Sequence, residues 1–321
     1  MQNQRLPPAI FLMGPTASGK TALSVQLAQA LGGEIISVDS TLVFKGMNIG
    51  TAKPTLEERG GIPHHLIDIL DPSESFSTGQ FRTRALALMD EISRRGKIPI
   101  LVGGTMLYFN ALLNGLAVLP EANSAIRAKL DQDLKQLGKD VLYQRLAKID
   151  PLAAARIHPN DPQRIQRALE VYEISGKPLS SFFNADQGED LPYQKIKLII
   201  APPDRKILHD IIAQRFRNML EQGFINEVKT LYLRGDLTEK MPSIRAVGYR
   251  QVWTYLQGED DFETMTEKAI IATRQLAKRQ FTWLRRETNA ISFQTGQADL
   301  LQKVLTVVMS QQSSFAARQP R

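Results

Sequence analysis

Eight consecutive residues near the N-terminus have the types and spacing of a phosphate-binding loop. Gly14-Pro15-Thr16-Ala17-Ser18-Gly19-Lys20-Thr21 matches the pattern G-x-x-x-x-G-K-[ST]. In such a loop, successive backbone N–H groups turn inward around an anion, and the following helix adds the partial positive charge of its N-terminus. We expect Lys20 to reach the terminal phosphate and the Thr21 hydroxyl to ligate Mg²⁺. The pattern leaves the compound open, because ATP, GTP and pyrophosphate esters all fit this geometry.

Asp39 is the acid best placed to act beside this loop. It follows the β-rich run Glu34–Val38, so it should project from the same edge of a sheet as the loop. There a carboxylate can orient Mg²⁺-bound water or accept a proton from an attacking group, and spacing alone does not choose between these roles. The guanine-binding pattern Asn-Lys-x-Asp is absent, and no strand fits well the ATPase pattern of four apolar residues followed by an acid.

Short β-rich runs alternate with longer amphipathic stretches through the first third of the chain. The expected strands are Ala9–Met13, Glu34–Val38, Leu66–Ile69 and Ile98–Val102. The segment Lys20–Leu31 after the phosphate loop is an expected helix. This alternation predicts an α/β fold with a parallel sheet flanked by helices. Together with the phosphate loop, it indicates a fold of the P-loop NTPase-like class. Ligands of such sheets bind beyond the carboxyl ends of the strands.

The pattern changes near Leu116, and no convincing strand follows until Ile196–Ala201. The region between them reads as helices only, with Gly138 and Gly176 as helix stops, and the expected helices are Ala122–Leu137, Lys139–Ile149 and Pro162–Ser175. We therefore expect an all-helical insertion at 118–193 within a catalytic core of 1–117 and 194–321. Beyond Ala201 the pattern is helical to about Arg286. A weak strand follows at Ala290–Phe293, and the tail after Met309 looks frayed.

Composition excludes several classes of protein. The 321 residues include no cysteine, which excludes disulfides, thiolate metal sites and a cysteine nucleophile, and the four histidines are scattered. No apolar run has the length of a membrane span, and the first eight residues do not resemble a signal peptide, so we expect a cytoplasmic protein. The net charge of +7 resides in residues 195–321, where Lys268–Arg286 holds six cations and no acid. Such a run suits either nucleic-acid contact or a solvated helix face.

Several stretches together resemble the bacterial tRNA dimethylallyltransferases, also called tRNA isopentenylpyrophosphate transferases. Besides the phosphate loop, they are Ser37-Val38-Asp39-Ser40, Lys45-Gly46-Met47, Ile49-Gly50-Thr51-Ala52-Lys53-Pro54, Val102-Gly103-Gly104-Thr105, Ser243-Ile244-Arg245-Ala246-Val247-Gly248-Tyr249-Arg250-Gln251 and Thr273-Arg274-Gln275-Leu276-Ala277-Lys278-Arg279-Gln280. They occur in the family's order and spacing from about residue 9 to about 287. The family fold is a P-loop α/β core with a helical insertion, which agrees with the gap in the strand pattern.

The resemblance implies transfer of the dimethylallyl group from dimethylallyl diphosphate to the exocyclic amine of the adenosine just 3′ of the anticodon in tRNA. By family analogy, the loop Gly14–Thr21 holds the diphosphate, Mg²⁺ on Thr21 offsets its charge, and Arg215 contacts the leaving pyrophosphate. We expect Asp39 to remove the proton as the C–N bond forms, and the Thr16 hydroxyl to bond the bridging oxygen.

The same family pattern implies an extended contact with the anticodon stem-loop of tRNA. Its expected contact residues are Asp39, Ser40, Thr41, Leu42, Thr105, Arg127, Gln163, Arg164, Ile165, Gln166, Arg167, Arg245, Ala246, Val247, Gly248, Tyr249, Arg250, Arg274, Lys278 and Arg279. Arg274 and Lys278 are four residues apart, so they share a helix face and can follow a phosphate backbone. Reaching the adenosine requires splaying it out of its stack toward Asp39. We expect no membrane partner and a monomer.

One position departs from the family. Phe44 stands where the family usually has Tyr, which removes a phenolic hydroxyl and keeps the ring. No Cys/His zinc module follows, which favours the bacterial type of enzyme. Three alternatives stay open: a P-loop kinase of small molecules, an adenylate isopentenyltransferase that takes a free nucleotide, and a non-catalytic RNA-binding protein. The insertion and the basic C-terminal segment disfavour the first two, and the intact phosphate loop disfavours the third.

Overall fold

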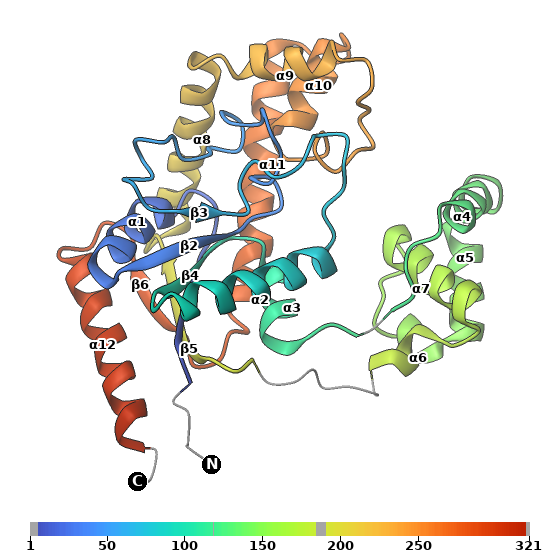
Figure 1. Cartoon of the computed structure of the whole chain (residues 1–321). Coiled ribbons are helices and arrows are strands. Elements are labelled where there is room, and N and C mark those ends of the chain that lie inside the picture. The colour runs from blue at the N-terminus through green and yellow to red at the C-terminus, as the bar shows by residue number, and fades with distance from the viewer. Residues whose placement is uncertain (1–5, 118, 184–190, 319–321) are drawn as a thin grey trace. The chain divides into compact units, whose positions relative to one another are not determined.

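Six parallel strands form the sheet at the centre of the core (Figure 1). The computed structural model describes residues 6–117, 119–183 and 191–318. The strand order β3-β2-β4-β1-β5-β6 interleaves segments that are distant in the sequence. The strands are β1 (Pro8–Met13), β2 (Gly33–Val38), β3 (His64–His65), β4 (Ile98–Gly103), β5 (Gln194–Ala201) and β6 (Ile291–Gln294). The expected parallel sheet is confirmed, and β5 and β6 lie beyond the helical insertion in sequence.

The register brings three strand ends to one place. Gly103 at the end of β4 is paired with Met13 of β1 on one side and with Val38 of β2 on the other. A side chain at Gly103 would not fit, because a Cβ there would lie 2.0 Å from the carbonyl oxygen of Val38. The phosphate loop after Met13, Asp39 after Val38 and the Gly104–Thr105 turn therefore start side by side.

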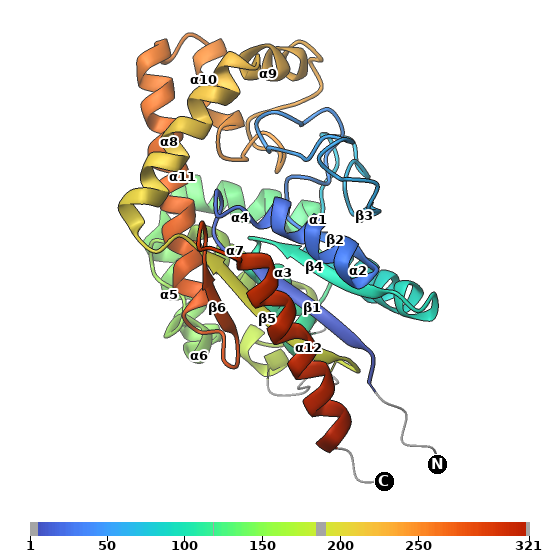
Figure 2. The same cartoon turned by 90° about the vertical axis from the view of Figure 1, so that its left-hand side faces the viewer.

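Helices cover both faces of the sheet (Figure 2). Alternate residues of β1 separate the two faces: Ile10 and Leu12 lie in the core shared with α1 and α12, whereas Phe11 packs on Phe109 of α3. Phe81 of α2 stacks on Tyr108 of α3, so α2 and α3 lie together on that second side. The helices of these layers are α1 (Lys20–Leu31), α2 (Thr78–Arg94), α3 (Met106–Asn114) and α12 (Leu300–Arg318).

A second core joins four helices to the long segment between β2 and α2. Its buried members include Phe44, Met47, Phe224 and Tyr249. The helices are α8 (Arg205–Glu221), α9 (Phe224–Tyr232), α10 (Tyr249–Leu256) and α11 (Phe262–Leu284). The ring of Phe44 is 1% exposed, so the substitution of the family tyrosine keeps the ring in this core. None of the helices in the described ranges is long and apolar enough to cross a membrane.

Residues 113–191 form a compact unit of helices, separate from the unit made by Met1–Leu112 and Pro192–Arg321. Leu130, Leu146 and Leu169 are buried in its own core. The helices Lys139–Ile149 and Pro162–Ser175 have the predicted bounds. Gly138 and Gly176 adopt positive φ and follow the helices that end at Leu137 and Ser175, as predicted. The elements are α4 (Ser124–Leu137), α5 (Lys139–Ile149), α6 (Pro151–Ala154), α7 (Pro162–Ser175) and the 3₁₀ helix η1 (Leu179–Phe183).

Two sequence expectations are wrong. The third strand covers only His64–His65, and the expected strand Leu66–Ile69 is a loop because Leu66 and Asp68 have φ of 62° and 56°. The tail after Met309 is helical to Arg318 as part of α12. Val304 and Val308 anchor this helix by burying their side chains in the core shared with the sheet.

Candidate functional site

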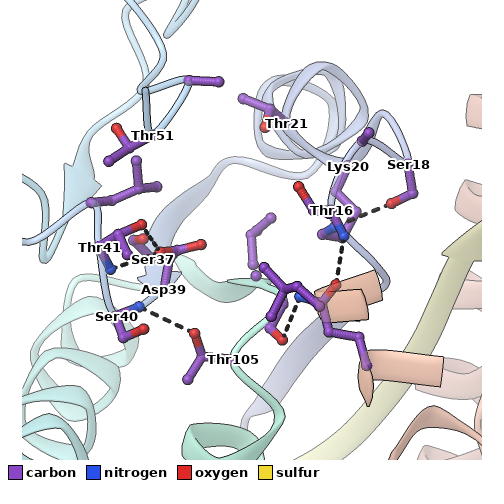
Figure 3. Close-up of a pocket in the computed structure, with 18 of the residues that line it drawn as sticks. Thr16, Ser18, Lys20, Thr21, Ser37, Asp39, Ser40, Thr41, Thr51 and Thr105 are labelled. Carbon is purple, nitrogen blue, oxygen red and sulfur yellow. Dashed lines mark hydrogen bonds between the residues drawn. The ribbon is translucent and has the colours of Figure 1, made fainter. Parts of the chain in front are cut away.

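A cavity of about 580 Å³ opens at the carboxyl ends of the strands. Its walls come from the phosphate loop, the turns after β2 and β4, helices α8 and α11, and the segments 50–54 and 247–248. Figure 3 shows Lys20 and Ser18 on one side of this cavity, with Asp39, Ser40 and Thr41 on another and Thr105 below them. The residues that the sequence predicted for the chemistry, Thr16, Lys20, Thr21, Asp39 and Arg215, all line it.

The phosphate loop has the expected form, with left-handed backbone at Ala17 and Gly19, where φ is 61° and 76°. The ammonium of Lys20 folds back over the loop. It donates to the Pro15 carbonyl at 2.5 Å and to the Ser18 hydroxyl at 3.1 Å (Figure 3). The lysine is thus held at the mouth of the cradle, where an incoming phosphate can replace these partners.

Gln280 of α11 fastens the phosphate loop to the neighbouring turn. Its Oε1 accepts the backbone N–H of Thr16 at 2.8 Å, and its Nε2 donates to the Gly104 carbonyl at 2.9 Å. The Thr16 amide is therefore engaged by the protein. On the other side of the loop, the Thr295 hydroxyl donates to the Ser18 carbonyl at 2.8 Å. Sequence reasoning named Gln280 only within the family motif Thr273–Gln280 and missed Thr295.

Asp39 is oriented through one of its two oxygens. Oδ1 accepts from the backbone N–H of Thr41 at 2.8 Å and from the Thr41 hydroxyl at 2.6 Å. The next residue is fixed as well, because the Ser40 N–H donates to the Thr105 hydroxyl at 3.1 Å. Among the described residues, none donates a hydrogen bond to Oδ2. The carboxylate is aimed by its neighbours and keeps an oxygen with which it can accept a proton.

Two cations share this cavity with Asp39. Burial lowers the pKa of the Lys20 ammonium to about 7, Asp39 opposes that shift, and Arg215 adds to it. Burial also lowers the pKa of the Arg215 guanidinium, again against the effect of Asp39. Burial disfavours the charged form of both cations, so an anion bound beside them would favour their charged forms. A diphosphate supplies that charge, so the electrostatics suit its binding and its departure as pyrophosphate.

The polar groups around Thr21 suit Mg²⁺ bound chiefly through a substrate. Thr21 is exposed and lines the cavity, and in the part of the chain that the structure describes no three acidic or histidine side chains form a metal cluster. Mg²⁺ retains waters and commonly uses one or two protein oxygens together with substrate phosphates. One hydroxyl beside a phosphate cradle fits that pattern.

Ser37 and His64 are cavity residues that sequence reasoning did not single out for a role. Among the described residues, the Ser37 hydroxyl and the Nε2 of His64 are buried without a hydrogen-bond partner. The other ring nitrogen of His64 lies 2.8 Å from the Ile62 carbonyl, and burial lowers the pKa of this histidine. Ser37 appeared only as part of the motif Ser37-Val38-Asp39-Ser40, and no sequence pattern marked His64.

The core residues that the sequence predicted to contact tRNA lie in different places. Val247, Gly248 and Arg279 line the cavity along with Leu42. Tyr249 is buried in the second core, and its hydroxyl donates to Glu227. The remaining candidates of this part lie outside the cavity lining, and they are Arg245, Ala246, Arg250, Arg274 and Lys278.

The arginines of the helical unit are held by acids. Glu170 is fully buried and accepts from the Arg127 Nε at 2.9 Å and from Arg167 at 2.7 Å. Arg164 pairs with Asp161 at 3.3 Å on the surface. Among their neighbours in the predicted contact, Ile165 is buried, and the Gln166 amide donates to Asp131. Ion pairing within the unit thus accounts for much of this charge pattern.

Comparison with known proteins relates the whole chain to one group of enzymes. A family model described as IPP transferase matches residues 42–287. A tRNA dimethylallyltransferase of Methylococcus capsulatus is 58% identical over 296 residues, which are 92% of this chain and 95% of that protein. The crystal structure of full-length tRNA isopentenylpyrophosphate transferase from Bacillus halodurans shares 39% identity with a TM-score of 0.71, covering 97% of each chain. A eukaryotic dimethylallyltransferase acting on tRNA shares 31% identity with a TM-score of 0.81, over 98% of this chain and 80% of that one.

Proposed function

The chain belongs to the IPP transferase family, and we propose that it transfers the dimethylallyl group of dimethylallyl diphosphate to the N6 amine of the adenosine immediately 3′ of the anticodon in tRNA. The observation that carries the mechanism is the shared cavity of Lys20, Arg215 and Asp39. In this cavity, Lys20 and Arg215 can stabilise a leaving diphosphate, and the oriented carboxylate of Asp39 lines the same space.

The reaction forms one bond and breaks another. The N6 nitrogen attacks the allylic C1 of the donor, the C1–O bond to the diphosphate breaks, and the electron pair leaves with the pyrophosphate. An adenine amine is a weak nucleophile, so catalysis depends on stabilising the leaving anion and on alignment. Lys20, Arg215 and the amides of the phosphate loop other than that of Thr16 act on that anion. The Thr16 hydroxyl is assigned to the bridging oxygen.

Asp39 takes the proton that N6 loses as the new C–N bond forms. The two hydrogen bonds from Thr41 to Oδ1 support this assignment, because they fix the direction of the carboxylate and leave Oδ2 for the proton. Thr21 would hold the metal ion. When bound, Mg²⁺ offsets negative charge on the diphosphate.

The anticodon loop of tRNA is assigned to surfaces next to this cavity and on the helical unit. Arg279, Val247 and Gly248 at the cavity wall support contact near the adenosine. The i, i+4 pair of Arg274 and Lys278 on α11 suits the phosphate backbone. The helical unit at about 118–193 is proposed as a tRNA-binding domain that acts through particular arginines.

The test is a transfer assay that also offers the substrates of the rival functions. The protein is incubated with Mg²⁺, dimethylallyl diphosphate and unmodified tRNA, and the digested nucleosides are identified by mass spectrometry. Parallel reactions offer AMP as acceptor, or ATP with small hydroxyl acceptors. Prenylated adenosine from tRNA supports the proposal. Prenylated AMP without modified tRNA would instead identify an adenylate isopentenyltransferase, and phosphate transfer from ATP would identify a kinase.

A further inference from the structure

Glu227 in the first turn of α9 binds an unusual number of donors. Its Oε2 accepts the backbone N–H groups of Asn48 at 2.9 Å and Ile49 at 2.8 Å. Its Oε1 accepts the N–H of Gly50 at 3.2 Å and the hydroxyl of Tyr249 at 2.5 Å. One carboxylate therefore ties the 48–50 segment to the start of α10.

Three consecutive N–H groups that point to one side make a concave site that normally suits an anion. Here the protein fills that concavity with its own carboxylate. The backbone at Gly50 also lies very close to two aromatic rings. A Cβ at this position would lie 2.0 Å from the Phe224 ring and 2.6 Å from the Tyr249 ring. Glycine at position 50 is what lets the segment rest on α9 and α10.

The two segments joined by Glu227 continue directly into the cavity wall. Gly50, Thr51 and Ala52 line the cavity from one segment, and Val247 and Gly248 line it next to Tyr249. Figure 3 shows Thr51 on the side away from Ser18 and Lys20. The position of Glu227 therefore sets how far apart these two parts of the wall stand.

Most side chains along this part of the wall are small or apolar. The apolar residues Ile212, Phe216 and Met219 of α8 line the same cavity, and Arg215 of that helix lies among them in the sequence. An apolar group attached to a diphosphate between Lys20 and Arg215 finds its matching surface here. This wall therefore suits the hydrocarbon tail of the donor.

We propose that Glu227 is a positioning residue that fixes the width of this apolar wall and thereby limits the donor to a five-carbon tail. It touches neither substrate and acts through the 50–52 and 247–248 segments. This inference rests on the proposed function, since it assumes an allylic diphosphate as donor. The inference predicts that weakening the hydrogen bonds of Glu227 lets the cavity accept a donor with a longer hydrocarbon tail.

The experiment compares kcat/KM for dimethylallyl and geranyl diphosphate with tRNA as acceptor. Glu227→Gln removes the charge and replaces one oxygen with a donor that cannot accept the N–H groups. We expect kcat/KM for dimethylallyl diphosphate to fall about tenfold and the geranyl-to-dimethylallyl ratio to rise about tenfold or more, because a pocket discriminates even one methylene by roughly 10–200-fold and geranyl adds a whole five-carbon unit. Glu227→Asp, which keeps the carboxylate, should move the ratio back toward wild type.

The matched control is Glu221→Gln, the same chemical change at an exposed site at the end of α8, which should leave the ratio unchanged. If Glu227→Gln does not fold, Tyr249→Phe removes only one donor to the carboxylate and should raise the ratio to a smaller extent. The inference would be overturned if kcat/KM fell equally for dimethylallyl and geranyl diphosphate, or did not fall for either. A wild-type protein that fails to transfer the dimethylallyl group would overturn the proposed function itself.

Discussion

The side-chain oxygen of Gln280 accepts the backbone N–H of Thr16 at 2.8 Å, although the two residues are 264 positions apart. The same side chain donates to the Gly104 carbonyl, and Gln280 is only 8% exposed. Helix α11 is thereby joined to both turns that flank the proposed diphosphate site. Since α11 also carries Lys278 and Arg279, this bond connects the proposed RNA-contacting helix to the phosphate loop.

Gln280→Ala should weaken both the fold and the phosphate loop. The substitution leaves the buried Gly104 carbonyl without its partner, at a cost of about 1–3 kcal/mol, and frees the part-buried N–H of Thr16 in the phosphate loop. Denaturant unfolding measures the stability, and calorimetric titration with pyrophosphate and Mg²⁺ measures the loop. The exposed Gln275 of the same helix provides the control as Gln275→Ala. Equal stability and equal pyrophosphate affinity in the two variants would contradict the bridging role.

Diphosphate binding should take up a proton at Lys20. Burial lowers the pKa of this ammonium to about 7, so above that pH the free protein holds it largely neutral. A bound diphosphate favours the charged form and raises the pKa again. Above pH 7, affinity should therefore fall with pH, by up to about tenfold per pH unit while the bound form stays protonated. Below pH 7 the lysine is charged in both states and contributes no pH dependence.

Calorimetry in two buffers of different ionisation enthalpy counts the protons. Wild type at pH 8 should take up nearly one proton more than Lys20→Met when pyrophosphate binds, because the ligand's own protonation is common to both proteins. The same proton count in both proteins would remove the lysine from this linkage.

The buried Glu170 should make Arg127 important for the stability of the helical unit. Arg127→Ala removes charged hydrogen bonds to a fully buried carboxylate, each contributing about 1.5–3 kcal/mol. Arg164→Ala breaks only the surface pair with Asp161 and should cost less than about 1 kcal/mol. Amide hydrogen exchange along α7 in the full chain measures the difference.

The difference in stability between Arg127→Ala and Arg164→Ala should also depend on pH. Burial by itself would raise the pKa of Glu170, but the hydrogen bonds from Arg127 and Arg167 lower it overall. A carboxyl whose folded pKa is depressed stabilises the fold above its unfolded pKa and loses that effect as pH falls through the folded pKa. The gap between the two variants should therefore close in acid. A gap absent at pH 7 would mean that Glu170 does not depend on Arg127.

Local patterns in the sequence predicted the parts of the fold that local chemistry controls. The helix Lys20–Leu31 follows from the phosphate motif, and α4 and α7 end at Gly138 and Gly176, where glycine can adopt the positive φ that these positions need. The strand expected at Leu66–Ile69 failed because a tertiary contact decides that segment. Asp68 pairs with Lys53 at 2.5 Å and has a positive φ, neither of which an apolar pattern reveals.

The sequence also predicted the part of the site that short local motifs encode. Lys20, Thr21 and Asp39 sit in short motifs with a fixed relation to strand ends, so their convergence follows from a parallel sheet. Gln280 and Thr295 bind the loop from more than 260 positions away, and no local pattern encodes such a contact. The charge pattern of the insertion could not separate arginines that pair with acids from arginines free for RNA.

The central claim is that Asp39 receives the proton during transfer to the tRNA adenosine. Asp39→Asn tests it directly, because its oxygen can still accept the hydrogen bonds from Thr41 while its amide cannot take a proton. The measurement is the single-turnover rate of prenylated adenosine formation with tRNA bound to excess enzyme. We predict a rate about 10²–10⁴-fold below wild type, with tRNA affinity nearly unchanged. A rate within a few-fold of wild type, at equal tRNA affinity, would contradict the claim.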